Sequence, residues 1–147
     1  IVAREFSYLH SLDSLKLAEK LDRLAAEADK KLPVLFELNV SGEESKAGFV
    51  AQDAHALIGL YPVFEQILSF PNLDVRGLMT LPPYFDQPER ARPFFRKLRN
   101  FQTILRQRFP GCEWNELSMG MSGDFEVAIQ EGATWVRIGT SIFGARQ

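Results

Sequence analysis

Two segments near the C-terminus combine glycine with hydroxyl residues directly after an apolar run. They are residues 117–124, LSMGMSGD, and residues 136–144, VRIGTSIFG. At the carboxyl end of a parallel strand, backbone N–H groups point outward, and glycine allows a ligand to approach them closely. In (β/α)8 barrels such turns, after strands seven and eight, form the usual phosphate site. Together the two turns predict an anion site, although each one alone is equally consistent with an ordinary turn.

Arg137 lies inside the second apolar run, two residues before Gly139. Burying an unpaired guanidinium is costly, so Arg137 must have a partner. One candidate is a carboxylate on a neighbouring strand, such as Glu37 or Glu116. The other is a heteroatom of a ligand, and residue types do not choose between the two.

Short apolar or β-branched runs alternate with longer segments of helical period along the chain. This alternation is typical of βα units and a parallel sheet. The predicted strands are 6–10, 34–40, 73–80, 114–119 and 134–139. The order β-α-β-α-β-α-β-α-β therefore predicts five parallel strands with helices between them.

The helices between these strands carry recognisable start signals. Ser11 or Asp13 can cap the first helix, and Asp53 opens a second that Pro62 should break or restart. Asp86 and Glu89 have the spacing of a capping box before the longest helix. Its predicted core stripe consists of Phe94, Leu98, Phe101 and Leu105, and its seven cations favour a solvated face over a nucleic-acid surface.

Composition excludes several classes of protein. The chain has 147 residues, 46% of them hydrophobic and 24% charged, which is typical of one packed domain. A net charge of -2 disfavours binding to nucleic acid or to an anionic membrane. The single cysteine, Cys112, and two histidines, His10 and His55, disfavour a disulfide framework and a metal site. We find no long apolar run or leader, so a cytoplasmic location is expected.

Four strings carry a resemblance to a known family: LHSLDSLKLAEKL, FELNVSGEESKAGF, RGLMTLPP and SMGMSGDFEVAIQEGATWVRIGTSIFG. They resemble the YggS/PROSC family of pyridoxal phosphate homeostasis proteins, whose fold is similar to the N-terminal barrel of alanine racemase. The resemblance implies a site for pyridoxal 5′-phosphate (PLP) in which Ser122, Gly139 and Thr140 hold the phosphate. It also implies that Arg137 faces the pyridine nitrogen. A cation there keeps the nitrogen unprotonated, which suits a carrier better than a catalyst of carbanion chemistry.

The chain departs from this family at its start. The family's PLP lysine lies at the end of the first barrel strand, whereas residue 1 here corresponds to the fourth. We therefore expect residues 1–147 to form a single α/β domain, a partial (β/α)8 TIM barrel of about five βα units equivalent to strands four to eight. The covalent lysine is expected to be absent, so PLP binding should be weak or lost. Lys46 is the one lysine placed in a loop on the ligand face.

Two functions follow from these expectations. The first is a non-catalytic PLP-binding protein with at most a residual phosphate or PLP site. The alternative is a barrel fragment that assembles into a homo-oligomer without a cofactor or enzymatic function. Losing three units should leave two open sheet edges and an uncovered apolar interior, which favours self-association. A racemase-like enzyme is disfavoured because its lysine base and partner domain are missing.

Overall fold

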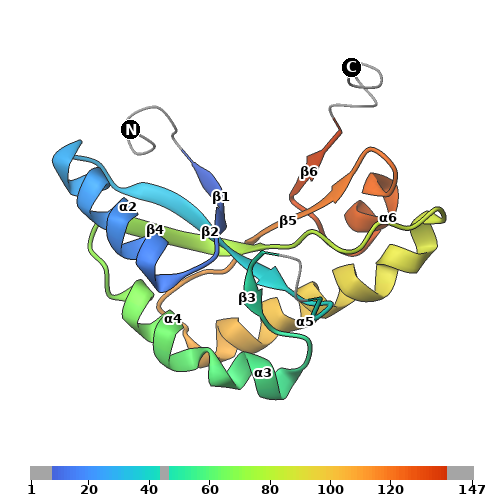
Figure 1. The fold of residues 1–147 in the computed structure, drawn as a ribbon, viewed down its shortest axis with the longest axis horizontal. Helices are drawn as coiled ribbons and strands as arrows, with labels where there is room; N and C mark the ends of the chain where they lie inside the picture. Colours follow the sequence, from blue (N-terminus) through green and yellow to red (C-terminus); the bar gives the residue numbers. More distant parts are fainter. Residues whose placement is uncertain (1–7, 44–46, 139–147) are drawn as a thin grey trace.

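Parallel strands form one curved sheet with helices packed on its outer face (Figure 1). The structure, a computed structural model, describes residues 8–43 and 47–138. The strand order is β1-β2-β4-β5-β6, and a short β3 pairs with β2. The strands are β1 (Leu9–Leu12), β2 (Leu32–Asn39), β3 (Phe49–Val50), β4 (Leu73–Met79), β5 (Glu116–Met121) and β6 (Trp135–Arg137). This arrangement confirms the predicted α/β class and the partial barrel.

The helices lie between the strands in sequence and cover the convex side of the sheet (Figure 1). They are α2 (Leu15–Glu27), α3 (Ala54–Gly59), α4 (Tyr61–Leu68), α5 (Arg92–Arg108) and α6 (Phe125–Gln130), with a 3-10 turn η1 (Pro88–Ala91) before α5. In the part of the chain that is described, no helix is long and apolar enough to cross a membrane.

The core lies between the sheet and these helices. Phe36 of β2 stacks on Phe64 of α4 with ring centroids 4.5 Å apart, and both side chains are fully buried. Burying one such side chain contributes about 2–3 kcal/mol. With three barrel units missing, nine apolar strand positions are expected to lose their cover. Val136 and Ile138 are partly exposed, but helices or other strand side chains cover the other seven, for which the expectation is wrong. These buried residues are Phe36, Leu38, Val75, Leu78, Met79, Leu117 and Met119.

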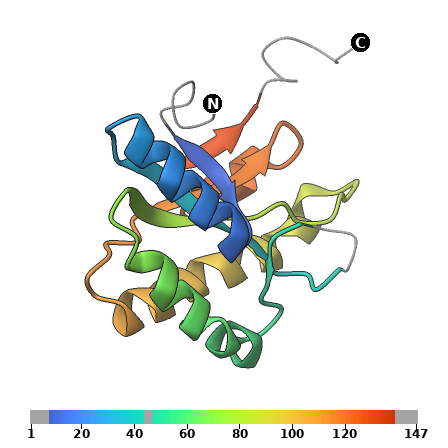
Figure 2. The ribbon, with the colours of Figure 1, turned by 60° about the vertical axis from the view of Figure 1, so that its left-hand side comes forward.

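Side chains join the two ends of the strand order across the concave face. The Trp135 ring of β6 lies 5.5 Å from Tyr8 and 4.9 Å from His10, centroid to centroid. Glu116 accepts hydrogen bonds from the Tyr8 hydroxyl and, at 2.7 Å, from Trp135 Nε1. We call Tyr8, His10, Trp135 and Glu116 the aromatic cluster. The sheet is thus curved enough to bring β1 close to β6 (Figure 2).

Glycine allows β4 and β5 to approach each other beside this cluster. A Cβ atom on Gly77 would lie 1.8 Å from the Glu116 carbonyl oxygen, which no side chain could tolerate. The register also shifts here, since Val34 pairs with Val75 and the next residue of β2 pairs with Gly77. Gly77 therefore fixes the close strand contact that places Glu116.

Of the four predicted helix-start signals, two are confirmed and two are wrong. Asp53 caps α3 by accepting a hydrogen bond from the Ala56 N–H at 2.8 Å, and Pro62 lies in the first turn of a separate α4. For α2 the cap is Ser14, which accepts from the Leu17 N–H, rather than Ser11 or Asp13. Ser11 cannot cap the helix because it still belongs to β1.

The predicted capping box before the longest helix is also wrong. Glu89 lies within η1, and its carboxylate binds the Arg92 guanidinium at 2.7 Å. A charged partner replaces the backbone N–H that a capping box would use. The buried stripe of α5 uses Phe95 in place of Phe94, whose ring instead packs against Phe85.

The fourth predicted strand begins later than expected. β5 starts at Glu116, two residues after Trp114, and extends to Met121. Trp114 is fully buried, has φ of 58°, and donates its Nε1–H to the Phe109 carbonyl at 3.0 Å. This conformation is incompatible with a strand, so Trp114 anchors the entry to β5.

Candidate ligand site on the concave face

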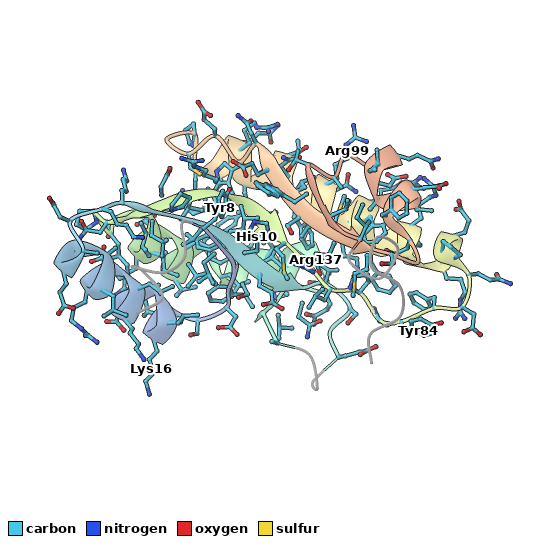
Figure 3. The ribbon with its side chains drawn as sticks, turned by 90° about the horizontal axis from the view of Figure 1, so that it is seen from above. Tyr8, His10, Lys16, Tyr84, Arg99 and Arg137 are labelled. Carbon is cyan, nitrogen blue, oxygen red and sulfur yellow. The ribbon has the colours of Figure 1, made fainter. Side chains whose placement is uncertain are left out.

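Polar side chains gather on the concave face because strand residues alternate between the two faces of a sheet. Phe36 points to the helices, so its neighbour Glu37 points to the opposite side. Seen from above, Tyr8, His10 and Arg137 lie over the middle of the sheet (Figure 3). The concave face therefore brings together groups from β1, β2, β5 and β6.

A chain of hydrogen bonds places Arg137. Its Nη2 donates to the Ser118 hydroxyl oxygen at 3.4 Å, and the same oxygen lies 2.9 Å from His10 Nδ1. Ser118 is 1% exposed. A guanidinium can only donate, so the serine oxygen accepts from Arg137 and its own proton is available to His10 Nδ1. The direction of the His10–Ser118 bond depends on the histidine tautomer, and a neutral His10 with an unprotonated Nδ1 can accept the serine proton.

Electrostatics favour the same neutral state. Burial lowers the pKa of His10, the Arg137 guanidinium lowers it further, and Glu116 opposes both. Burial also lowers the pKa of Arg137, and Glu37 opposes that shift. His10 and Arg137 therefore disfavour each other's charge, and Arg137 keeps its own because a guanidinium stays protonated in proteins.

Neither of the two predicted carboxylate partners forms an ion pair with Arg137 in the described part of the chain. Glu116 is taken by Tyr8 and Trp135, and one of its oxygens lies 4.0 Å from Arg76. Glu37 acts on Arg137 only through longer-range attraction. The half-buried guanidinium thus has a serine hydroxyl as its one side-chain hydrogen-bond partner among residues 8–43 and 47–138.

The turn that carries Ser122 follows β5 directly beside Arg137. Met121 pairs with Arg137 in the register of β5 and β6. Asp124 closes the turn, because its carboxylate accepts from the Met121 N–H at 2.7 Å. Ser122 and Gly123 line a cavity of about 400 Å³ together with residues of η1 and α6, and Arg137 is not part of its lining. Apart from its two chain neighbours, no residue has an atom within 4 Å of where a Cβ on Gly123 would be.

Of the four predicted site residues, the structure thus places Ser122 and Arg137 close together. Gly139 and Thr140 lie outside the described residues, and so does Lys46. The expected phosphate contacts of Gly139 and Thr140 therefore stay predictions.

Two cations of α5 fix the helix that follows the Ser122 turn. Glu131, 6% exposed at the end of α6, accepts from Arg92 at 2.7 Å and from Arg96 at 3.1 Å. A buried carboxylate with two guanidinium partners holds α6 against α5. Arg92 is therefore less solvated than predicted, with 21% of its side chain exposed, whereas Arg96 remains on the solvated face at 60%.

The lysines of the described ranges lie on helices or in the connection before β2. Lys16 and Lys20 are on α2, Lys30 and Lys31 follow it, and Lys97 is on α5. Lys97 Nζ donates to the carbonyls of Val40 and Gln52 at 3.0 and 2.8 Å. It therefore ties α5 to the loop after β2.

Sequence reasoning missed the contribution of His10 and Ser118. Ser118 sits between two apolar residues of a predicted strand, and that alternation was a usable signal. His10 gave no comparable signal, because its contact with Ser118 spans 108 residues and depends on the curvature of the sheet.

The fold and site define a βα-barrel protein with a polar inner face, and the comparisons identify its family. The family described as "Alanine racemase, N-terminal domain" matches residues 3–147, and this chain belongs to that family. It is 47% identical to a pyridoxal phosphate homeostasis protein of Aquifex aeolicus, over 95% of this chain and 58% of that protein. The protein of the same name from Escherichia coli is 36% identical, over 99% and 59%.

Solved structures show the same likeness. The structure of PipY from Synechococcus elongatus without PLP matches with a TM-score of 0.86 and 34% identity, covering 97% of this chain and 64% of PipY. PipY with PLP bound matches with a TM-score of 0.83, covering 97% and 63%. The chain spans about three fifths of these relatives, and its equivalence to barrel strands four to eight stays a prediction.

The His10–Ser118–Arg137 contacts predict how His10 titrates. Replacing Arg137 with Gln removes a positive charge, so the pKa of His10 should rise while burial still keeps it below its ordinary value. Because folding favours neutral His10, its contribution to stability is full above the ordinary histidine pKa and is lost as the pH falls through the lower folded-state pKa. NMR titration of the His10 imidazole signals in the wild type and in Arg137→Gln measures this. An unchanged His10 titration in Arg137→Gln would contradict the arrangement.

Proposed function

We propose that this chain binds PLP, or a closely related phosphorylated pyridine, and does not catalyse a reaction on it. One observation carries this proposal: a half-buried guanidinium on the concave face with no ion-pair partner among the described residues. Ser118 accepts from one N–H of this guanidinium, and its other N–H groups require further acceptors. Relatives named pyridoxal phosphate homeostasis proteins, and the PipY structure with PLP bound, support PLP as the source of such an acceptor.

The residues present fit such a ligand. Arg137 would donate to the pyridine nitrogen, and Ser122 would donate to the phosphate from the adjoining turn, together with Gly139 and Thr140. The half-buried Arg137 and the open backbone at Gly123 leave room for both contacts. PLP supplies a reactive aldehyde and an electron-poor ring when bound.

The position of Arg137 also supports the non-catalytic part of the proposal. A permanent cation at the ring nitrogen disfavours protonation of that nitrogen. An unprotonated ring withdraws electrons less strongly, so carbanion chemistry is disfavoured. PLP bound in this way would be carried by the protein and would not take part in catalysis.

We further propose that the binding is non-covalent and weak. The described lysines lie away from the strand positions that form the concave face, and Lys97 already binds two carbonyls. Affinity would then come from a few charge-assisted hydrogen bonds, each contributing about 1.5–3 kcal/mol.

Substitutions in the site should weaken binding of both PLP and inorganic phosphate to different extents. Arg137→Ala removes a charged donor and should reduce PLP affinity roughly ten- to hundredfold. Ser122→Ala removes a hydrogen-bond donor, and Gly139→Val blocks access to the backbone. Each should lower the affinity for both PLP and inorganic phosphate. Equilibrium dialysis measures each affinity, and Arg99→Ala, an exposed arginine of α5 (Figure 3), is the matched control. Wild-type affinity in all three site variants would remove the assignment.

A second candidate function is assembly into a homo-oligomer, and the sheet edges favour it. β1 pairs with β2 alone and β6 with β5 alone among the described residues, so each presents an unpaired backbone edge. Met121 and Trp135, beside the β6 edge, are 51% and 43% exposed. Unpaired strand edges are templates for pairing with another chain. We propose edge-to-edge association driven by these edges.

This assembly predicts that the 147-residue chain sediments as an oligomer at micromolar concentration. Ser11→Lys places a charge on the β1 edge and should shift the distribution toward the monomer, because edge lysines oppose strand pairing. Analytical ultracentrifugation measures both proteins. A stable, folded wild-type monomer would contradict the proposal.

A further inference from the structure

Glu37 is a buried carboxylate without a bonded partner among the described residues. It is 5% exposed on the concave side of β2, where Arg137 attracts it and Asp13 repels it at longer range. No hydrogen bond or ion pair to its carboxylate is present in residues 8–43 and 47–138. A buried charge in this state is costly, so it calls for a donor that the described residues do not provide.

The carboxylate of Glu37 can be reached from the concave face. In the described structure, every fully buried side-chain oxygen has a hydrogen-bond partner. Since the Glu37 oxygens have none, they must keep some contact with open space. The neighbouring strand position is Met79, which pairs with Glu37 in register and offers no hydrogen-bond donor from its side chain.

Glu37 and Arg137 therefore present opposite charges to the same space without bonding to each other. Burial and Asp13 raise the pKa of Glu37, and Arg137 lowers it. Arg137 offers donors and Glu37 offers acceptors. A ligand that bridges the two side chains must carry a hydrogen-bond acceptor for Arg137 and a hydrogen-bond donor for Glu37. A cationic donor suits Glu37 best because it also offsets the carboxylate charge.

We propose that Glu37 binds the protonated amine of a phosphorylated aminomethyl-pyridine, so that the site favours pyridoxamine 5′-phosphate over the aldehyde and alcohol forms. This inference rests on the proposed function, because Arg137 must bind the ring nitrogen. The ammonium group donates up to three hydrogen bonds, and the alcohol donates one neutral bond. The aldehyde oxygen only accepts, so it would face a carboxylate that also accepts.

The affinities of matched ligands for the 147-residue chain test this inference. Equilibrium dialysis compares pyridoxamine 5′-phosphate, pyridoxine 5′-phosphate and inorganic phosphate. We expect the wild type to bind the amine form about tenfold more tightly than the alcohol form, as one charge-assisted hydrogen bond allows. Glu37→Gln should reduce this preference to about twofold or less. Glu19→Gln, which removes the same charge from the exposed side of α2, should leave it unchanged.

The possible outcomes separate this inference from the proposed function. Equal affinity of the two pyridines for the wild type, or an unchanged preference in Glu37→Gln, would overturn the inference and leave phosphopyridine binding intact. Absence of binding by all three ligands would overturn the proposed function and the inference with it. Glu37→Gln should melt at or above the wild-type temperature, because it removes a buried unpaired charge. If that variant fails to fold, the wild-type preference alone decides.

Discussion

A half-buried positive charge, for which the described residues offer no carboxylate partner, is the constraint that organises the concave face of this protein. Arg137 contacts the Ser118 hydroxyl, which also forms a hydrogen bond with His10 Nδ1. Had Glu116 paired with Arg137, the charge would be neutralised inside the protein. Glu116 instead binds Tyr8 and Trp135, which leaves the charge of Arg137 available to a ligand.

The convex face of the sheet contributes mainly to stability, and the concave face carries the candidate ligand site. On the convex side, helices bury aromatic and aliphatic residues such as Phe36, Phe64 and Trp114. On the concave side, the same strands present polar groups, which do not contribute to hydrophobic packing. Side chains of α5 stabilise the segments around the site. Arg92 and Arg96 form ion pairs with Glu131 at the end of α6, and Lys97 donates hydrogen bonds to the loop after β2. Rigid outer packing thus supports a site whose own charges are incompletely paired.

Local signals predicted much of the fold. Continuous apolar runs gave the strands at 34–40 and 73–80 almost correctly, and Asp53 and Pro62 marked helix starts that the structure confirms. The errors arose where tertiary contacts replaced a local preference, as when Glu89 bound Arg92 instead of capping a helix.

For the site, sequence reasoning singled out Arg137 and Ser122 but could not choose the partner of Arg137. That choice depends on curvature, which brings β1 across to β5 and β6. His10 and Glu37 became candidates for the same reason, since no local pattern reveals which buried polar groups remain unpaired. A crystal structure of the chain with PLP tests the account most directly. It should show the ring nitrogen within hydrogen-bond distance of Arg137 and the phosphate at the Ser122 turn. A ligand bound elsewhere, for example in the cleft beside Cys112 at the opposite end of β4 and β5, with Arg137 uncontacted, would contradict it.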